Sequence, residues 1–234
     1  MNLTELLCRI FRLPNIIGKN NKIILRKDGK EQKIIFLPRG LYIYIRGNNN
    51  VCKISYPHSF ANSKIIMKRD NNIFELGYSM DHMKNATFRI EDGGIFKIGN
   101  NCQFYSGNFF GICYNSHNIK HKIEIGNNVL FAQDVIVRCG DGHTVFDTNT
   151  KLPLNEPQDI IIDDNVWITS RCILLKKTHI PEGSIVAANS VVNKCFNNKN
   201  ILIGGSPAKL LKQDISWNRA SYCDYVKNIE GENV

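Results

Sequence analysis

The chain has 234 residues, which suits one domain with terminal additions, and its 43% apolar content is enough for a continuous core and excludes a disordered chain. Its formal net charge is +9, but the 30 Lys and Arg residues are scattered, without the basic helix or aromatic-interleaved motif typical of nucleic-acid binding. We therefore expect no nucleic-acid partner, and a basic surface that attracts an anionic cofactor or a polyanionic glycan.

The cysteines bear on two questions, the redox state of the protein's compartment and whether the chain binds a metal. The chain has eight cysteines and no signal peptide, which predicts a reducing cytoplasm. No pair has the CxxC spacing of a zinc site, and no His/Glu cluster is evident, so we expect no metal.

The N-terminal segment, residues 1–22, has an apolar helical pattern. Arg9 and Arg12 interrupt it before it reaches the length of a signal peptide or a membrane span. We predict a short helix docked on the body, without a transmembrane span. Peripheral membrane contact is the alternative.

Residues 23–85 alternate apolar runs with turns, which predicts strands. The stretch Gly47 to Val51 resembles one six-residue unit, but the six-residue period is not kept through this segment. We expect irregular or wider coils that cap the N-terminal end of a repeat array.

A six-residue period dominates residues 86–202. It is clearest after Ile160, where the first position of successive units holds Ile162, Ile168, Leu174, Ile180, Val186 and Val192. A hexapeptide cannot bury its inner residues alone, so such units must stack as coils around a shared core. The period slips at Asn115 to Asn118 and resumes at Ile119.

The fourth and fifth positions of the units support this reading. Asn165, Gly183 and Asn189 at the fourth position tolerate the left-handed conformation of a tight corner, whereas Arg171 and Lys177 fit it less well. The fifth position holds small or β-branched residues. Cys102 and Cys172 lie there, and we predict that they pack in the core and do not catalyse.

Two segments leave the repeat. Residues 139–157 are polar and rich in Gly, Asn and Pro, and they predict an extruded loop in which His143 lies close to Gly140 and Gly142. Residues 203–234 predict a C-terminal arm, with Trp217 as a packing anchor.

These motifs resemble those of the hexapeptide-repeat acyltransferases. The six-residue period and the ending IGGSPAKLL (Ile203 to Leu211) carry the family resemblance, and the loop DGHTVFD (Asp141 to Asp147) followed by Trp167 is most similar to the sialic-acid and capsular-polysaccharide O-acetyltransferases. The resemblance implies an all-β fold, a left-handed parallel β-helix built as a hexapeptide-repeat solenoid. It also implies acetyl-CoA as cosubstrate and a homotrimer with the cofactor groove between neighbouring prisms.

Transfer of acetyl to an alcohol needs a base that is neutral near pH 7, which suits histidine. His143 matches the catalytic histidine of the family, and a solvated loop histidine is the alternative. Its ring needs an orienting group, for which Asp141, Asp147 or a backbone carbonyl could serve.

Trp167 occupies the sixth position of its unit, so its indole should point away from the core and be covered by something. The resemblance places it near the catalytic histidine, where it would contact the sugar or the acetyl and pantetheine arm. A plain subunit contact is the alternative.

Acetyl-CoA would lie along the prism wall, where its pantetheine arm meets outward backbone amides of the last coils. Thr169, Ala187 and Ala188 are small enough to allow that approach, and Lys194 and Lys209 match the basic positions of the family near the nucleotide. The alternative is that Lys194 and Lys209 are solvated lysines that bind no cofactor.

The expected function is transfer of acetyl from acetyl-CoA to a sugar hydroxyl of a surface glycan or its precursor. N-acetylation of an amino-sugar nucleotide and acylation of a small alcohol such as serine are the enzymatic alternatives. A trimeric scaffold without activity is the third, but it would not need His143 or an outward Trp167. The sequence leaves the acceptor and its hydroxyl open.

Overall fold

The computed structural model describes residues 3–112 and 120–231, and it is nearly all β. The predicted slip of the repeat around Asn115 to Asn118 and its restart at Ile119 lie outside these residues. The described strands form three sheets of eight, named here sheets A, B and C.

Sheet A consists, in order, of β1 (Asn15–Ile17), β4 (Leu41–Arg46), β7 (Ser63–Lys68), β10 (Thr87–Glu91), β13 (Phe109–Ile112), β16 (Ile136–Arg138), β19 (Ile173–Leu175) and β22 (Val191–Val192). Sheet B consists of β20 (His179–Ile180), β17 (Ile160–Ile162), β14 (Lys122–Ile125), β11 (Ile95–Ile98), β8 (Ile73–Leu76), β5 (Val51–Ser55), β2 (Lys22–Lys27) and β3 (Lys30–Lys33). Sheet C consists of β24 (Ala208–Lys212), β23 (Leu202–Gly205), β21 (Ile185–Val186), β18 (Trp167–Ile168), β15 (Leu130–Phe131), β12 (Gln103–Phe104), β9 (His82–Lys84) and β6 (Ser59–Ala61).

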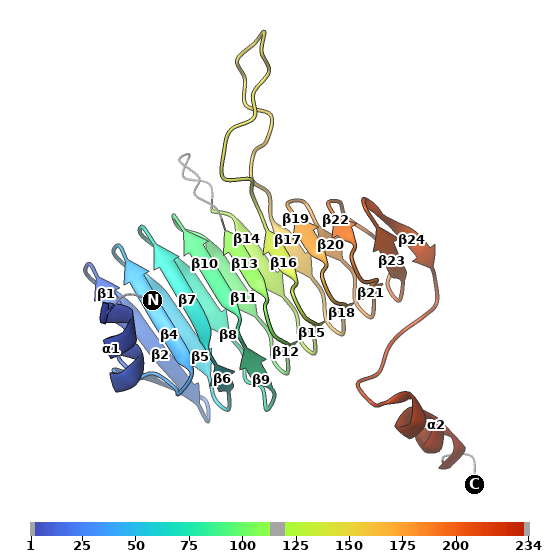
Figure 1. Ribbon diagram of the computed structural model, residues 1–234, viewed down its shortest axis with the longest axis horizontal. Helices are drawn as coiled ribbons and strands as arrows, with labels where there is room; N and C mark the ends of the chain where they lie inside the picture. The colour runs from blue at the N-terminus through green and yellow to red at the C-terminus, as the bar shows by residue number, and fades with distance from the viewer. Residues whose placement is uncertain (1–2, 113–119, 232–234) are drawn as a thin grey trace.

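The chain visits the three sheets in turn, so that a strand usually pairs in parallel with the third strand after it (Figure 1). Antiparallel pairs close the two ends, β2 with β3 and β23 with β24. The result is a stack of three-sided coils, each of which buries its inner side chains against the coils on either side.

The first coils are wider than the last ones. Parallel partners lie 22 positions apart at Ile43 and Ile65, and 18 positions apart at Leu174 and Val192. Large side chains fill the wide coils, since Phe88 stacks on Phe110 at a centroid distance of 4.9 Å and Phe104 stacks on Phe131 at 5.0 Å. Later coils bury Ile, Leu and Val instead.

The predicted left-handed corners are confirmed, and the two positions judged a poorer fit are corners as well. Asn165, Gly183 and Asn189 have φ of 57°, 71° and 58°, in the left-handed region. Arg171 and Lys177 adopt the same conformation, with φ of 58° and 70°. The geometry of the closed coil therefore imposes this conformation even where the side chain disfavours it, at a cost of roughly 1–2 kcal/mol per residue.

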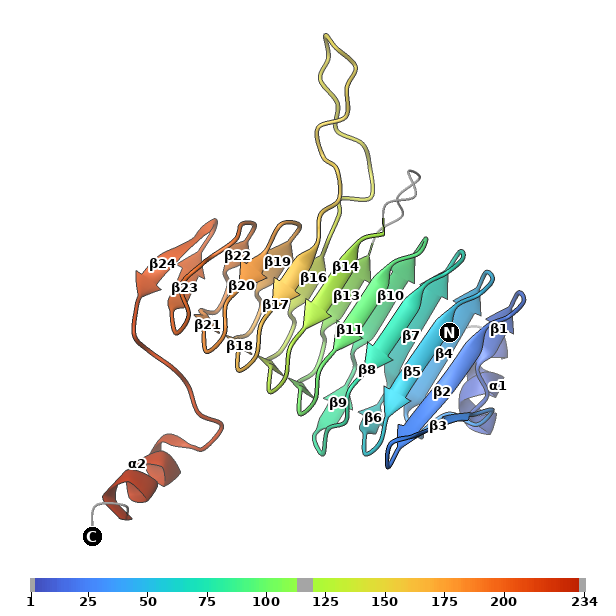
Figure 2. The same ribbon diagram turned by 180° about the vertical axis from the view of Figure 1, so that it is seen from behind.

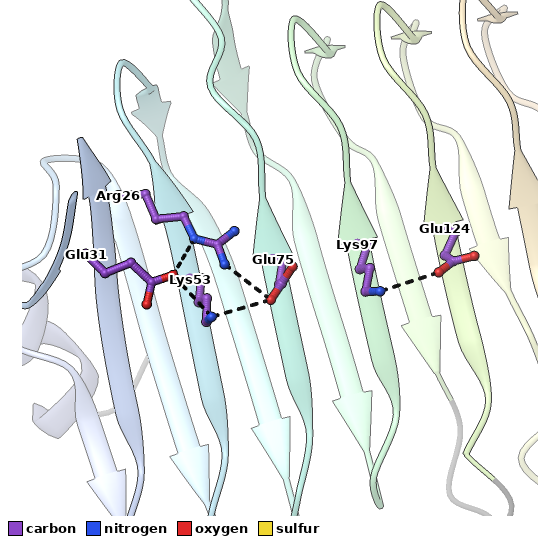
Figure 3. Close-up of polar contacts among 6 residues, drawn as sticks. All are labelled: Arg26, Glu31, Lys53, Glu75, Lys97 and Glu124. Atoms are coloured by element: carbon purple, nitrogen blue, oxygen red, sulfur yellow. Dashed lines mark hydrogen bonds and ion pairs between the residues drawn. The ribbon is translucent and has the colours of Figure 1, made fainter. Parts of the chain in front are cut away.

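The outer face of sheet B carries a row of oppositely charged side chains that pair with one another (Figure 3). Lys53 reaches Glu31 at 3.2 Å and Glu75 at 3.9 Å, while Lys97 reaches Glu124 at 3.7 Å. Such partly exposed pairs contribute about 0–1 kcal/mol each. Their main consequence is a polar wall, which does not favour burial of this face against an apolar partner.

The helix at the N-terminus packs on the first coils, whereas the helix at the C-terminus lies at the end of an arm that leaves the last coil (Figure 1). The helix α1 (Leu3–Phe11) lies against β1 and β4. After β24 the C-terminal arm runs back along the corners of sheet C, because Ile215 N–H donates to Asn200 O at 3.0 Å and Arg219 reaches Asp81 at 2.7 Å. The chain then ends in α2 (Tyr222–Gly231).

Candidate active site

The predicted extruded loop connects β16 of sheet A with β17 of sheet B and projects away from the stack (Figure 1). Gln158 N–H donates to Cys139 O at 3.0 Å and closes the base of the loop. Farther out, Leu154 N–H donates to Val145 O at 2.8 Å, so the two arms of the loop support each other. The loop is therefore a paired ribbon held by the rigid coils below it.

His143 lies on the first arm of this ribbon, and its side chain is exposed. Its backbone carbonyl accepts a hydrogen bond of 2.7 Å from Asn155 Nδ2 on the other arm. Asn155 also accepts from Val145 N–H at 2.7 Å. The backbone at His143 is thus fixed, while its imidazole bonds to no other residue among 3–112 and 120–231.

Asp141 does not orient the ring of His143. Its Oδ2 accepts from Lys176 Nζ at 2.6 Å and from Asn155 Nδ2 at 2.9 Å. Burial alone would raise the pKa of this carboxyl, but the bonds from Lys176 and Asn155 outweigh that effect and hold the pKa below its usual range. Asp141 is therefore ionised at neutral pH and ties the loop to the coil that carries Lys176.

Asp147 does not contact the ring of His143 either. Its Oδ1 accepts from the backbone N–H groups of Asn149 and Thr150, at 2.9 and 2.7 Å, and so shapes the tip of the loop. The sequence left Asp141, Asp147 or a backbone carbonyl as possible orienting groups for the imidazole. The two carboxylates do not contact it. The contacts of Asn155 and Lys176 could not be predicted from the sequence, because both depend on where the loop folds back.

Replacing Asn155 with alanine should lower kcat by about 10- to 100-fold, because the backbone carbonyl of His143 loses its anchor and the base loses its position. The melting temperature should hardly change, and protease sensitivity of the loop should rise. Asn149→Ala at the loop tip is the control, because its backbone and not its side chain contacts Asp147. Unchanged kcat in Asn155→Ala would show that this anchor does not position the base.

Trp167 points outward from β18, as predicted, but its own chain covers it. The indole of Trp217 lies 5.9 Å away between ring centroids at an angle of 41°, and Trp217 Nε1 donates to Asn165 O at 2.6 Å. The prediction that Trp217 is a packing anchor is confirmed. The C-terminal arm of the same chain thus supplies part of the cover that an outward Trp167 requires.

One donor of Trp167 is left over. Its Nε1–H is buried and has no hydrogen-bond partner among the described residues. An unpaired buried donor costs about 1–3 kcal/mol. A group retained at that cost is a candidate for contact with a ligand, once the arm moves or the ligand enters beside it.

A row of small residues follows Trp167 on sheet C. Thr169 and Ala187 come directly after the paired residues Ile168 and Val186, and Gly204 occupies the same place on the next coil. Lys209 is exposed and pairs with Gly204 across β24. The row thus carries small side chains, and Lys209 places a cation at its end.

The backbone amides in this row are not free, contrary to expectation. Thr169 N–H donates to Val186 O at 3.1 Å, and Ala187 N–H donates to Ile203 O at 2.8 Å. The hydroxyl of Thr169 also bonds to Val186 O, at 2.6 Å. The wall thus offers small side-chain surfaces instead of open amides. Ala188 is exposed at the following corner.

Lys194 lies elsewhere. It follows β22 of sheet A. The backbone of its neighbour Cys195 forms an isolated parallel β-bridge with His179 of sheet B. Its ammonium lies 5.2 Å from the centroid of the Phe196 ring. Lys194 and Lys209 therefore occupy different sides of the prism.

The candidate residues fall into two groups. His143, Asp141 and Lys194 lie where the chain passes from sheet A to sheet B, whereas Trp167, Thr169, Ala187 and Lys209 lie on sheet C. In the part of the chain that the structure describes, no hydrogen bond or ring contact joins His143 to Trp167. One protomer thus presents two halves of the predicted site on different faces.

The two cysteines at the fifth position of their units have structural roles. Cys102 and Cys172 are buried in the core, as predicted. Burial raises the pKa of Cys102 to about 12 and raises the pKa of Cys172, so both are protonated at neutral pH. Across residues 3–112 and 120–231, no three His, Cys, Asp or Glu side chains gather in a way that could hold a metal ion.

Comparison with known proteins points to the same family as the motifs. No protein-family model matches the chain. A polysialic acid O-acetyltransferase of Escherichia coli O1:K1 / APEC is 29% identical over 109 residues, 47% of this chain and 35% of that protein. A polysialic acid O-acetyltransferase of Neisseria meningitidis is 27% identical over 103 residues, 44% of this chain and 48% of that protein. The match thus spans less than half the length of each relative.

Solved structures extend the comparison to 94% of the chain. The crystal structure of the polySia-specific acetyltransferase NeuO has a TM-score of 0.77 at 23% identity, over 94% of this chain and 98% of that one. The polysialic acid O-acetyltransferase OatWY has a TM-score of 0.51 at 22% identity, over 94% of this chain and 98% of that one. The sequence similarity and the shared fold confirm that this chain resembles the sialic-acid O-acetyltransferases among the hexapeptide-repeat acyltransferases.

Proposed function

We propose that this protein transfers acetyl from acetyl-CoA to a hydroxyl of a surface glycan or its precursor, with a sialic-acid polymer as the first acceptor class to test. The fold would be the left-handed parallel β-helix of hexapeptide coils. The observation that carries the proposal is His143, on a ribbon anchored by Asn155, in a chain similar to polysialic acid O-acetyltransferases. The basic net charge of +9 suits both an anionic cosubstrate and a polyanionic acceptor.

In this mechanism His143 accepts the proton of the acceptor hydroxyl as the oxygen attacks the thioester carbonyl. The carbon–sulfur bond then breaks, the acetyl group remains on the sugar, and the CoA sulfur leaves with the proton that His143 returns. The transfer is direct, so no acetyl-enzyme is required. Asn155 and Asp141 act as positioning residues, since both hold the loop and neither contacts the imidazole.

The separation of the two groups supports a site shared between subunits. The His143 loop of one protomer would face the Trp167 wall of sheet C in the next, so that acetyl-CoA lies between the two prisms. Sheet B, whose charges pair with one another, would then face solvent. A closed ring of three protomers makes three such sites by one repeated contact.

We expect light scattering at micromolar concentration to give the mass of a trimer of the 26.7 kDa chain. The trimeric fraction should carry the activity. A monomer with full activity would contradict both the trimer and the shared site, but it would leave the reaction itself untouched.

Replacing Trp167 with alanine should lower kcat/KM by about 10- to 1,000-fold if its indole contacts the acceptor or the acetyl arm. Trp217→Ala is the matched comparison, because it removes the covering indole and leaves Trp167 in place. The functional role predicts a larger loss for Trp167→Ala at every enzyme concentration, with the trimer intact. If Trp167 is only an interface anchor, activity should recover as protein concentration rises.

Mixing two inactive variants tests the shared site directly. His143→Ala and Trp167→Ala chains, unfolded and refolded together in equal amounts, should recover about one quarter of the wild-type activity, since that fraction of interfaces combines two intact residues. A site contained in one protomer predicts no recovery above the two variants assayed separately.

A further inference from the structure

Large exposed apolar side chains gather at the N-terminal end of the stack. They come from α1, from β1 and from the segment after β3, which lie at the same end of the molecule (Figure 2). The set is Leu3, Leu6, Leu7, Ile10, Phe11, Ile16, Ile17, Ile35 and Phe36, and we call it the N-terminal apolar patch. A monomeric water-soluble surface rarely carries such a patch without a partner for it.

The helix α1 is docked with its polar side inward. Leu3, Leu7 and Ile10 follow the spacing of one helix face, and they are 70%, 44% and 62% exposed. The side chains of Glu5 and Arg9 on the other face are only 18% and 20% exposed. A surface helix normally buries its apolar stripe, so this orientation is the reverse of the usual one.

Specific contacts hold the polar side of α1 on the body. Arg9 donates to Glu5 and to Asn62 Oδ1, both at 3.1 Å, and its guanidinium lies 5.1 Å from the centroid of the Tyr42 ring. Lys64 of β7 reaches Glu5 at 3.2 Å. These contacts fix the helix with its leucines toward solvent.

A second set of contacts joins the helix to the segment after β3. Arg12 Nε donates to Leu37 O at 2.8 Å, and Leu37 N–H donates to Arg12 O at 2.7 Å. The exposed pair Ile10 and Phe11 precedes Arg12, and the exposed residue Phe36 precedes Leu37. The reciprocal bonds therefore make one surface of two segments that are distant in sequence.

The same end of the chain is strongly basic. Residues 1–40 contain nine Lys and Arg against three Asp and Glu, a formal charge of +6 out of the +9 of the whole chain. A second copy docked on this end would bring two such charges together, which opposes association of like ends. An anionic surface is the complementary partner for apolar side chains at this basic end of the chain.

We propose that the N-terminal apolar patch docks on an anionic lipid surface. Its leucine, isoleucine and phenylalanine side chains enter the headgroup boundary, and the exposed Lys30 and Lys33 of β3 contact lipid phosphates. No helix in the described ranges is both long and apolar enough to cross a membrane, so the contact is peripheral. The stack of coils then stands on the membrane with its last coils farthest from it (Figure 2).

The test uses the full chain and vesicles of phosphatidylcholine with and without phosphatidylglycerol, read by flotation at low and high salt. Binding should require phosphatidylglycerol and weaken as salt rises. Lys30→Ala with Lys33→Ala, on exposed β3, should weaken the partition by about 30-fold, at about 1 kcal/mol for each lysine.

Ile10→Asp with Phe11→Asp should weaken the partition by at least about 10-fold, because charge replaces inserted side chains. Met80→Asp is the control, since Met80 is 80% exposed and lies outside the patch. Circular dichroism should show all variants folded.

Three results would overturn the proposal. The first is equal binding to vesicles with and without phosphatidylglycerol, and the second is no binding to either. The third is end-to-end association of protein in solution that Ile10→Asp abolishes, which would make a second copy the occupant.

Discussion

Replacing His143 with alanine should lower kcat by about 10²- to 10⁴-fold, which is the usual contribution of a positioned general base. The loop lies outside the repeat core and His143 is exposed, so the melting temperature should not change. Binding of acetyl-CoA should persist, because the proposed cosubstrate wall lies on sheet C. Initial rates of CoA release and calorimetric binding of acetyl-CoA measure the two effects separately.

Thr144→Ala is the matched control for this experiment, because Thr144 is the next exposed residue on the same arm. It should keep kcat within about twofold of wild type. If His143→Ala retained near wild-type turnover, His143 would not be the base, and Asp141 and Asp147 would be the next groups to test.

Replacing Val186 with aspartate should unfold the chain or cause it to aggregate. Val186 is 0% exposed and pairs with Ile168 and Ile203 on the adjacent coils, so the new carboxylate would have no partner in a shared narrow core. A cost above about 4 kcal/mol is a large fraction of the roughly 5–15 kcal/mol that stabilises a typical domain. Ile168→Asp should behave in the same way.

The control places the same substitution on the outer face. Ile136 is 37% exposed and directly precedes the buried Val137 on β16. Ile136→Asp should leave the cooperative melt within a few degrees of wild type. A soluble Val186→Asp protein that melts cooperatively would show that the inward register is wrong.

The repeat could be predicted from the sequence because its inward positions follow a fixed spacing. Ile168 and Val186 are completely buried, and Asn165 and Asn189 form left-handed corners, as the pattern requires. A local period carries this information, since each coil repeats the same two constraints. The doubt about Arg171 was misplaced, because closure of the coil overrides the preference of one side chain.

Contacts between the repeat and its excursions could not be predicted in this way. Lys176 lies on the repeat, and its ammonium binds Asp141 of the loop, a residue 35 positions earlier. Trp217 covers Trp167 from an arm that no periodicity describes. Such contacts depend on the path of the loop and the arm in space, which residue spacing does not determine.

The sequence predicted which residues belong to the site, but it did not predict how they are arranged in space. The motif indicated His143 and Trp167 together, whereas the chain carries them on a loop between sheets A and B and on sheet C. This division is what a shared site requires. It also explains why residues of one motif need not touch within one protomer.

The measurement that tests the central claim most directly is release of free CoA from acetyl-CoA in the presence of defined acceptors. Sialic-acid polymers, other capsular glycans, nucleotide-sugars and serine should be compared with the purified chain and with His143→Ala. The account predicts acceptor-dependent CoA release with a glycan, O-acetyl groups on that glycan by NMR, and loss of both in the variant. Release that is independent of any glycan, or equal in His143→Ala, would contradict it.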